Sequence, residues 1–354
     1  MNFLKEKPSI QRIVPRHVVP GGRMTIMGSG FNGRIGNTSE IKVNGTPAHI
    51  NCATSRSLTV SLPDEIEGEN VGLSIAGETI DDVDLQIAKT LAKNVHPVDN
   101  PVLDDEGNIY TTLSGSRGEK CPVSVFVIRP DGTCESFLTD IMNPTSMAFG
   151  PDHALYVSSR FNGVVYRVSS PKDVSVYAGD LGTATGIVFD RFGNLLVGDR
   201  SGTVYCVTAQ KRVVPMFSIP PSVAAFHLCL GPDGSLYITN PDISTYDAIL
   251  RIGPGESEPS VFYPGIKRPQ GMAFDVEGNL YVAKAMAGDS GVIRITPKGK
   301  ATMIASGPVL VGVAIDQAGN MILAGTSAIY RLRLGIPGLP LALTSLFSEP
   351  KMSV

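Results

Sequence analysis

A hairpin pattern that recurs about every forty residues constrains the fold of this chain more than any other feature. Its clearest copy spans 269–282, where two short apolar runs with strand alternation flank the polar turn at 275–279. A period of this length is typical of the blades of a β-propeller. Each copy is therefore expected to form the first two strands of one blade.

Six copies of the turn occur, and the strand that follows each turn keeps its register. The turns lie at 104–108, 150–154, 190–194, 231–235, 275–279 and 316–320. The matching residues of the second strands are Tyr110, Tyr156, Leu196, Tyr237, Tyr281 and Ile322, at gaps of 46, 40, 41, 44 and 41 residues. Glycine at the fourth turn position in most copies indicates a backbone with positive φ. Six hairpins predict six blades.

Each hairpin is followed by a third strand and then by a more polar fourth strand. The third strands are expected at 125–128, 165–168, 204–207, 249–252, 292–295 and 329–332, and examples of the fourth lie at 173–177 and 301–304. A closed ring of four-stranded blades leaves only short, protected edges. We therefore predict an all-β chain with a six-bladed propeller over 91–345 and a C-terminal tail over 346–354.

Arginine recurs in the third strand of four blades. These residues are Arg167, Arg251, Arg294 and Arg331. Recurrence at one blade position favours a structural role, such as bonding a neighbouring loop, over a binding patch.

The segment 8–90 lacks the repeat and follows a tail at 1–7. Its short alternating strands are separated by glycine, asparagine and proline turns, which suggests a small β-sandwich. The Gly-Ser-Gly-Phe at 28–31 and the Val-Asn-Gly-Thr-Pro-Ala hairpin at 43–48 resemble the IPT/TIG family. This resemblance implies an immunoglobulin-like sandwich that serves as a spacer or adhesion module.

The end of this segment leaves two questions. Residues 83–91 are either the last sandwich strand or a linker into the propeller. The acidic cluster at 81–84 has the carboxylates that a Ca²⁺ site needs, but a solvated loop is the preferred interpretation.

Charge and cysteine content narrow the classes of function. The formal net charge is -3, 18% of the residues are charged and no basic block is present, so we expect neither nucleic acid nor membrane as a partner. No apolar signal segment is found, so a cytoplasmic protein is expected. The cysteines are odd in number and irregularly spaced, and we expect free thiols that mostly act as small core residues. They are Cys52, Cys121, Cys134, Cys206 and Cys229. The oligomeric state stays open.

In a propeller, the loops before the first strand and after the second strand of each blade converge on one mouth of the central channel. The residue just before each inner strand is expected to point at this mouth. These residues are Asp99, Thr145, Thr185, Phe226, Gln270 and Val311. Further polar candidates near the same rim are Arg160, Asp199, Arg200, His227, Asn240, Asp242 and Lys284. The loops at 111–120 and 240–247 are the expected sites of specificity.

The segment 95–345 resembles the NHL-repeat and SMP-30/gluconolactonase-like propellers. In the lactonase branch a divalent cation is held by a Glu at the start of the first blade and by Asn and Asp residues of later blades. The resemblance implies that Asp99 takes the place of the Glu and Gln270 that of the Asp, with Phe226 or Thr185 at the Asn position. One carboxylate therefore remains, whereas Ca²⁺ prefers six or more oxygen ligands with negative charge among them.

Two functions follow from these features. The preferred hypothesis is a binding or scaffold module without a cofactor, whose propeller face recognises a small neutral ligand or a protein partner. The alternative is a metal-dependent lactone or ester hydrolase with Ca²⁺, Zn²⁺ or Mn²⁺, for which Asp99, Asn240 and Asp242 are weak metal candidates and Asp99 and His227 are catalytic candidates. His227 has the chemistry of a general base, although a hydrogen-bonded core histidine is the commoner role in an apolar strand.

Overall fold

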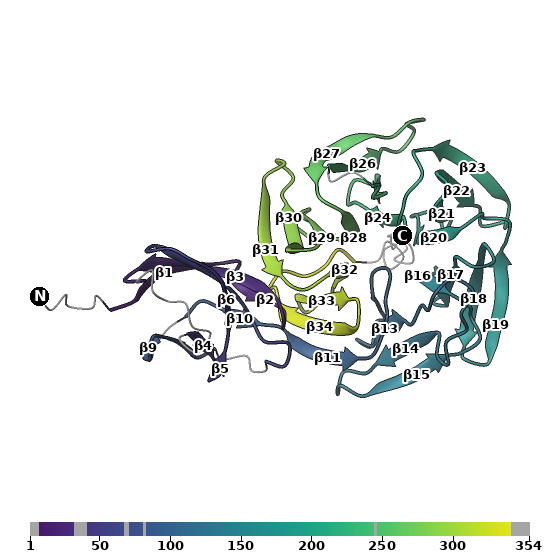
Figure 1. Ribbon diagram of the computed structural model, residues 1–354. Helices are drawn as coiled ribbons and strands as arrows, with labels where there is room; N and C mark the ends of the chain where they lie inside the picture. The colour runs from purple at the N-terminus through teal and green to yellow at the C-terminus, as the bar shows by residue number, and fades with distance from the viewer. Residues whose placement is uncertain (1–6, 32–40, 67–70, 81–82, 244–245, 341–354) are drawn as a thin grey trace, which may run out of the picture.

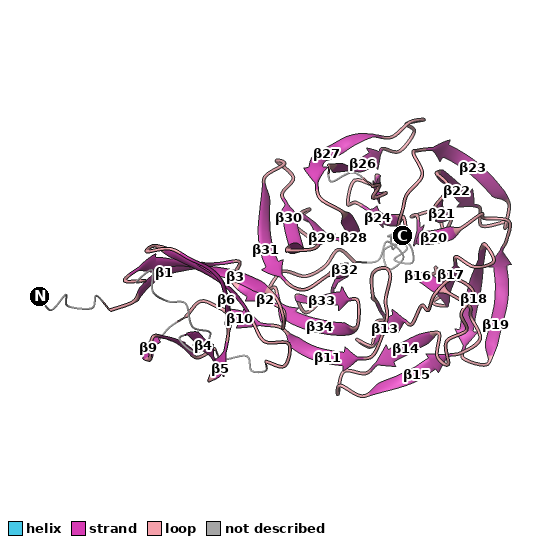
Figure 2. Ribbon diagram, in the orientation of Figure 1, coloured by secondary structure: helices cyan, strands magenta, loops and turns pink. Residues whose placement is uncertain are grey.

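The protein is built from strands. The computed structural model describes residues 7–31, 41–66, 71–80, 83–243 and 246–340, and none of these residues is helical (Figure 2). Consistently, no helix of the described residues could span a membrane. A small sandwich is followed by a six-bladed propeller, as the repeat predicts (Figure 1).

The sandwich contains two sheets of four strands. The first, in spatial order, is β1 (Ser9–Val14), β3 (Arg23–Ser29), β7 (Ser57–Ser61) and β6 (His49–Ala53). The second is β5 (Thr46–Pro47), β4 (Ile41–Val43), β8 (Leu73–Ile75) and β9 (Glu78–Ile80). The β4–β5 hairpin turns through Asn44 and Gly45, which both have positive φ, as a tight two-residue hairpin requires. Alternate residues such as Met24 and Ile26 fill the core between the sheets.

Five blades are formed by consecutive strands, which run from the channel outward. Blade 1 contains β12 (Val102–Leu103), β13 (Ile109–Thr112), β14 (Val125–Ile128) and β15 (Cys134–Leu138). Blade 2 contains β16 (Pro144–Phe149), β17 (Leu155–Ser159), β18 (Val164–Ser170) and β19 (Asp173–Ala178). Blade 3 contains β20 (Ala184–Phe189), β21 (Leu195–Asp199), β22 (Thr203–Val207) and β23 (Val213–Ser218). Blade 4 contains β24 (His227–Leu230), β25 (Leu236–Thr239), β26 (Asp247–Ile252) and β27 (Ser260–Ile266). Blade 5 contains β28 (Pro269–Phe274), β29 (Leu280–Met286), β30 (Asp289–Ile295) and β31 (Ala301–Ser306).

Blade 6 is completed by a strand from the other end of the propeller sequence. Its strands are β32 (Leu310–Ile315), β33 (Asn320–Gly325), β34 (Ala328–Arg333) and, on the outside, β11 (Lys89–Lys93). Residue 89 pairs with Arg331 and residue 93 with Ala328 in an antiparallel ladder. The ring is therefore closed by backbone hydrogen bonds, and the domain boundary predicted at residue 90 falls inside β11.

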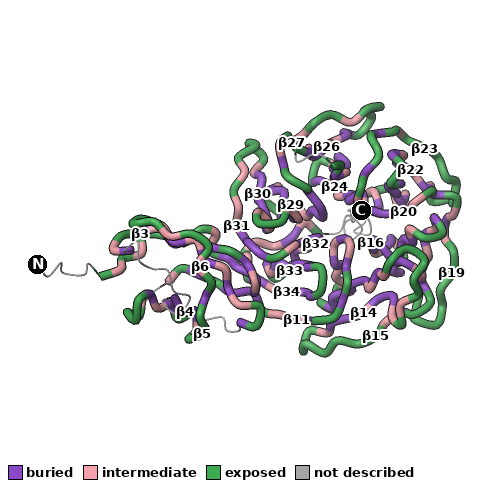
Figure 3. The backbone as a smooth tube through the Cα atoms, viewed as in Figure 1, coloured by how far each residue is buried: buried purple, intermediate pink, exposed green. Residues whose placement is uncertain are grey.

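The apolar core of the propeller lies between neighbouring blades. Inner strands are buried and the outer strands β15, β19 and β23 are largely exposed (Figure 3). Tyr110 packs edge-on against Phe137 and Phe149, with ring centroids 4.9 and 5.5 Å apart. Tyr156 and Tyr237 make the same pair of contacts in their blades. The aromatic residue of the repeat thus joins its own blade to the next.

The aspartate of the repeat organises the turn between the first two strands. In blade 5, Asp275 Oδ1 accepts the backbone N–H groups of Glu277 and Asn279 at 2.9 and 2.8 Å. Its Oδ2 accepts Asn279 Nδ2–H and the Tyr281 hydroxyl at 2.8 and 2.9 Å. Gly278 follows at φ 78°, in the left-handed region that glycine occupies without strain.

In two blades the recurring arginine forms an ion pair with the aspartate of the turn between the first two strands. Arg167 pairs with Asp152 at 2.6 Å, and Arg251 pairs with Asp233 at 3.1 Å. The prediction of a structural role is confirmed for these two residues.

The sandwich and the propeller share one sheet. The short strands β2 (His17–Val18) and β10 (Gln86–Ile87) add in parallel to the outer strand β31, so that blade 5 continues into a six-stranded sheet. The side chain of Val18 lies in the core of the sandwich, and that of Val19 lies in the core between blades 5 and 6. This continuity fixes the sandwich to the rim of the ring (Figure 1).

The buried histidine at this junction makes stability depend on pH. His17 is 6% exposed, and its Nδ1–H donates to the Ile304 carbonyl at 3.0 Å. Burial lowers the pKa of His17 from its usual value of 6.5, and the charge of Arg16 lowers it further. The hydrogen bond to Ile304, the charge of Asp84 and a hydrogen bond with Gln86 oppose the shift in part. The unfolded chain then binds more protons than the native one just below pH 6.5, so the free energy of unfolding should fall as pH drops through this range.

Urea unfolding at several pH values should show a smaller fall for His17→Phe than for the wild type. The exposed His49→Phe is the control, and an identical pH dependence in both variants would contradict the assignment.

The five cysteines are free thiols, as predicted, and Cys206 and Cys229 pack against the cores between blades, whereas the expected core position is wrong for the exposed Cys52 and Cys134. Cys52 and Cys134 are exposed, and the other three are half-buried. Cys134 lies opposite Ile128, as the hairpin predicts.

Candidate functional site

Two residues from opposite sides of the ring meet across the channel. Asp99 precedes the first strand of blade 1, and His227 begins the first strand of blade 4. Their side chains are 4% and 0% exposed, and His227 Nδ1 lies 2.6 Å from Asp99 Oδ1. Because a carboxylate only accepts, Nδ1 carries the proton of this bond. The pair therefore bridges blades 1 and 4.

Gln270 of blade 5 completes this cluster. Its Oε1 lies 3.3 Å from His227 Nε2, and its buried Nε2 has no partner among the described residues. In this orientation both imidazole nitrogens donate, as in an imidazolium that faces a carboxylate. Turning the amide would let Nε2 donate to a neutral imidazole and leave Oε1 without a donor. In both arrangements one buried amide atom of Gln270 requires a partner from outside the cluster.

Asn100 forms the backbone clasp beneath the cluster. Its Nδ2–H donates to the Met272 carbonyl, and its Oδ1 accepts Val313 N–H, both at 2.9 Å. A Cβ at Gly271 would lie 2.0 Å from Asn100 Oδ1, so this approach requires glycine. These hydrogen bonds of Asn100 between blades 1, 5 and 6 were not predicted from the sequence. Gly271, directly after Gln270, was the one sequence feature that could have indicated such a close approach.

The other residues of the predicted ring have partners or packing contacts of their own. Thr145 donates to Asn143 O, and Thr185 donates to Gly198 O while accepting Phe226 N–H. Contrary to the expectation, Phe226 is fully buried against Gly198 in the core between blades 3 and 4. Val311 is likewise buried, between blades 6 and 1. Of the six predicted positions, the structure brings Asp99 and Gln270 together, and it adds His227.

Three arginines gather near the mouth over blades 1, 2 and 3. Arg160 is half-buried and donates to Gly115 O at 2.8 Å, which places it against the loop that contains Arg117. Burial lowers the pKa of Arg160, and the charges of Arg200 and then Arg117 lower it further. None of the three has a carboxylate within 4.0 Å among the described residues. This cluster has spare N–H donors and no acid to accept them.

The remaining polar candidates of the rim are held by structural contacts. Asp199 accepts Thr183 N–H at 2.8 Å, and Arg200 donates to Ser222 O and Val223 O at 3.0 and 2.8 Å. Asn240 donates to Pro220 O at 3.1 Å, and the exposed Asp242 donates its backbone N–H to Asp247. Lys284 pairs with Asp289 at 2.9 Å. Neither Asn240 nor Asp242 therefore joins the central cluster.

The central residues do not fit a divalent cation. Asp99 is the one carboxylate present, and its Oδ1 already accepts His227 and Asn100 N–H. No group of three or more His, Cys, Asp or Glu side chains with metal-binding geometry occurs among the described residues. Ca²⁺ requires six or more oxygens, and Zn²⁺ requires three protein ligands. The acidic cluster predicted at 81–84 lies partly outside the described residues.

The cluster also lacks the parts of a nucleophilic site. Both nitrogens of His227 face hydrogen-bonding partners, whereas a general base needs one nitrogen free to reach a substrate or water proton. Desolvation, followed by the charge of Asp99, raises the pKa of the nearby Cys229 to about 12, so its thiol stays protonated at neutral pH.

Comparisons with known proteins give a family match for the sandwich and similar folds for the propeller. Residues 8–87 match the family model of the IPT/TIG domain. No curated protein matches the sequence. The fold is similar to a gluconolactonase from Xanthomonas campestris, with a TM-score of 0.57 and 16% identity over 71% of this chain and 89% of that one. It is also similar to regucalcin, a calcium-binding protein from Agrobacterium tumefaciens, with a TM-score of 0.55 and 18% identity over 71% and 95%.

A third similar structure extends beyond the propeller. An auxiliary nutrient binding protein from Bacteroides thetaiotaomicron aligns over 92% of this chain and 98% of its own, with a TM-score of 0.54 and 14% identity. At these identities the similarities establish a shared fold.

Proposed function

We propose that this chain, an IPT/TIG sandwich joined to a six-bladed propeller, is a binding module that holds a small, neutral, oxygen-rich molecule at the channel mouth. The observation that carries the proposal is the unpaired amide of Gln270 beside the Asp99–His227 pair. An unpaired buried polar group costs about 1–3 kcal/mol, and a hydroxyl or carbonyl of a ligand would remove this cost.

The arginine cluster extends the same chemistry to the rim. Among the described residues, Arg160 uses one of its five N–H donors and Arg200 uses two, so both have further donors for ligand oxygens. The nutrient-binding protein aligns over 92% of this chain and therefore with both of its parts, whereas the gluconolactonase aligns over 71%. The comparison therefore favours a binding function over a hydrolase.

Binding of glucose and xylose, measured by saturation-transfer NMR and calorimetry, tests the proposal. Gln270→Met should weaken the binding about tenfold, because one buried hydrogen bond is worth about 1.4 kcal/mol at this site. The exposed Gln210→Met, on the opposite face of the ring, is the matched control and should bind as the wild type does. The hydrolase alternative would prevail if a divalent ion survived dialysis and supported lactone hydrolysis that Asp99→Ala abolished.

A further inference from the structure

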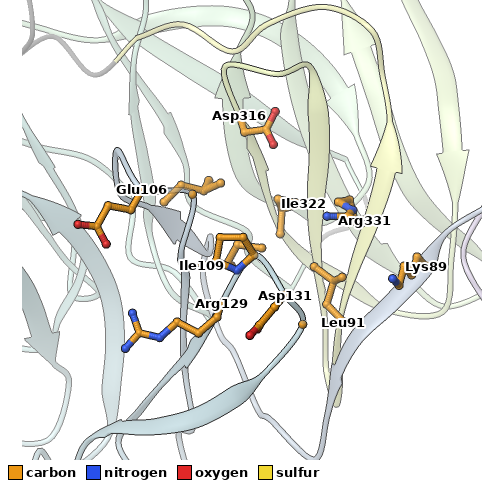
Figure 4. Close-up of a pocket in the computed structure, with 13 residues that line it drawn as sticks. Lys89, Leu91, Glu106, Ile109, Arg129, Asp131, Asp316, Ile322 and Arg331 are labelled. Atoms are coloured by element: carbon orange, nitrogen blue, oxygen red, sulfur yellow. The ribbon is translucent and has the colours of Figure 1, made fainter.

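A pocket with a volume of about 210 Å³ lies at the seam where blade 6 meets blade 1 (Figure 4). It opens on the face of the turns between first and second strands, away from the channel mouth. Leu91, Leu103, Ile109 and Ile322 form its apolar floor. At about 30 Å³ for each water, it has room for roughly seven waters, which is smaller than the drug-sized pockets of about 300–1,000 Å³.

Two cations stand side by side on one wall of this pocket. Lys89 of β11 and Arg331 of β34 are directly opposed partners in the antiparallel ladder that closes the ring, and Figure 4 shows them on the same side. Neither has a carboxylate within 4.0 Å among the described residues. Like charges that face each other across two strands are destabilising. An anionic group between them would remove this repulsion.

Asp131 supplies a carboxylate to the lining of the pocket. Asp131 Oδ1 accepts Thr133 N–H at 2.8 Å, and the Thr133 side chain is a second hydrogen-bonding partner of this carboxylate. The hydrogen bond from Thr133 holds the pKa of Asp131 below its usual range, so the carboxylate stays charged. Two further acids line the pocket: Asp316, whose oxygens accept Asn320 N–H and Nδ2–H at 2.7 Å, and Glu106, whose Oε2 accepts Asn108 Nδ2–H at 3.3 Å. Arg129 is paired with Glu135 at 3.6 Å.

We propose that this pocket binds a free α-amino acid with a small aliphatic side chain. The ligand carboxylate lies between Lys89 and Arg331, where the planar guanidinium can donate two parallel hydrogen bonds. The ligand ammonium faces Asp131, and the aliphatic side chain covers the apolar floor. The site is independent of the channel mouth, and a ligand there bridges the first and last blades.

Titration with L-valine tests the proposal, with calorimetry and methyl NMR as the readouts. The methyl signals of Leu91, Leu103, Ile109 and Ile322 should shift, while those of the channel mouth should not. Isovalerate lacks the ammonium group and should bind at least about tenfold more weakly than valine. Isobutylamine lacks the carboxylate and should show a similar loss of affinity. The proposal is overturned if valine does not bind at about 10 mM or if isovalerate binds equally well, which would indicate a plain carboxylate site.

The matched variants are Arg331→Gln and Arg333→Gln. Arg331→Gln should weaken valine binding about tenfold, because it removes one of the two cations. Arg333 lies two residues further along β34 and does not line the pocket, so its substitution should leave binding unchanged. Thermal unfolding without ligand separates misfolding from lost binding: Arg331→Gln should unfold at or above the wild-type temperature because the repulsion with Lys89 is relieved. Equal valine affinity in both variants contradicts the proposal.

Discussion

Asp275→Ala is expected to lower the free energy of unfolding by about 3–5 kcal/mol, one of the largest effects of any single substitution in the chain. The carboxylate is fully buried and accepts four hydrogen bonds, from Glu277 N, Asn279 N, Asn279 Nδ2 and the Tyr281 hydroxyl. Alanine leaves all four donors without this acceptor. The Tyr281 side chain is itself 0% exposed, so no water reaches its hydroxyl without a rearrangement of the turn.

Urea unfolding of three variants measures this effect. Asp105→Ala is the matched control, because Asp105 is an exposed turn residue, and it should change the free energy of unfolding by less than about 0.5 kcal/mol. Asp275→Asn keeps one acceptor oxygen, so its loss in the free energy of unfolding should lie between those of Asp275→Ala and Asp105→Ala. If Asp275→Ala unfolded within about 1 kcal/mol of the wild type, the turn network would not be the stabilising element that its geometry indicates.

Removing either Asp99 or His227 is expected to lower the free energy of unfolding about as much as Asp275→Ala does. Either Asp99→Ala or His227→Leu leaves the other buried polar group without its partner, and each should destabilise by about 3–5 kcal/mol. The double variant leaves no orphaned partner of this pair. It should therefore lose about 1.5–3 kcal/mol less than the sum of the two single losses.

A double-mutant cycle from denaturant unfolding gives this coupling directly. The exposed pair of Lys7 and Glu78, at 3.4 Å, is the control cycle and should show coupling of at most about 1 kcal/mol. Additive losses for Asp99 and His227, within about 0.5 kcal/mol, would show that the contact across the channel contributes little to stability.

The period of the sequence was enough to predict the blades, because each hairpin is a local structure. The turn aspartate, the glycine and the aromatic residue all act within one repeat, as Asp275, Gly278 and Tyr281 do. The outer strand of blade 6 could not be predicted in this way. Residues 89–93 pair with 328–331, at the far end of the propeller sequence, and no local pattern marks such a pairing.

The candidate site was predicted only in part, because it is assembled from several blades and is not a local structure. Asp99, Gln270 and His227 were all candidates, but their contact depends on the register of inner strands from three blades. Blades 2, 3, 5 and 6 shift register between their first two strands, whereas blade 4 pairs from His227 to Leu230 without a shift. Aligning the blades by their turns cannot show this difference. Phe226 was therefore expected at the mouth, although it lies in the core.

The closure of blade 6 by β11 also sets an order on biosynthesis. During translation β11 emerges directly after the sandwich, while its partner β34 emerges only after the strands of blades 1 to 5. The ring cannot close until β34 has been synthesised, and until then β11 is an unpaired edge open to wrong partners. Because the sandwich can fold first and β10 immediately precedes β11, a nascent chain halted before β34 should expose this edge to chaperones.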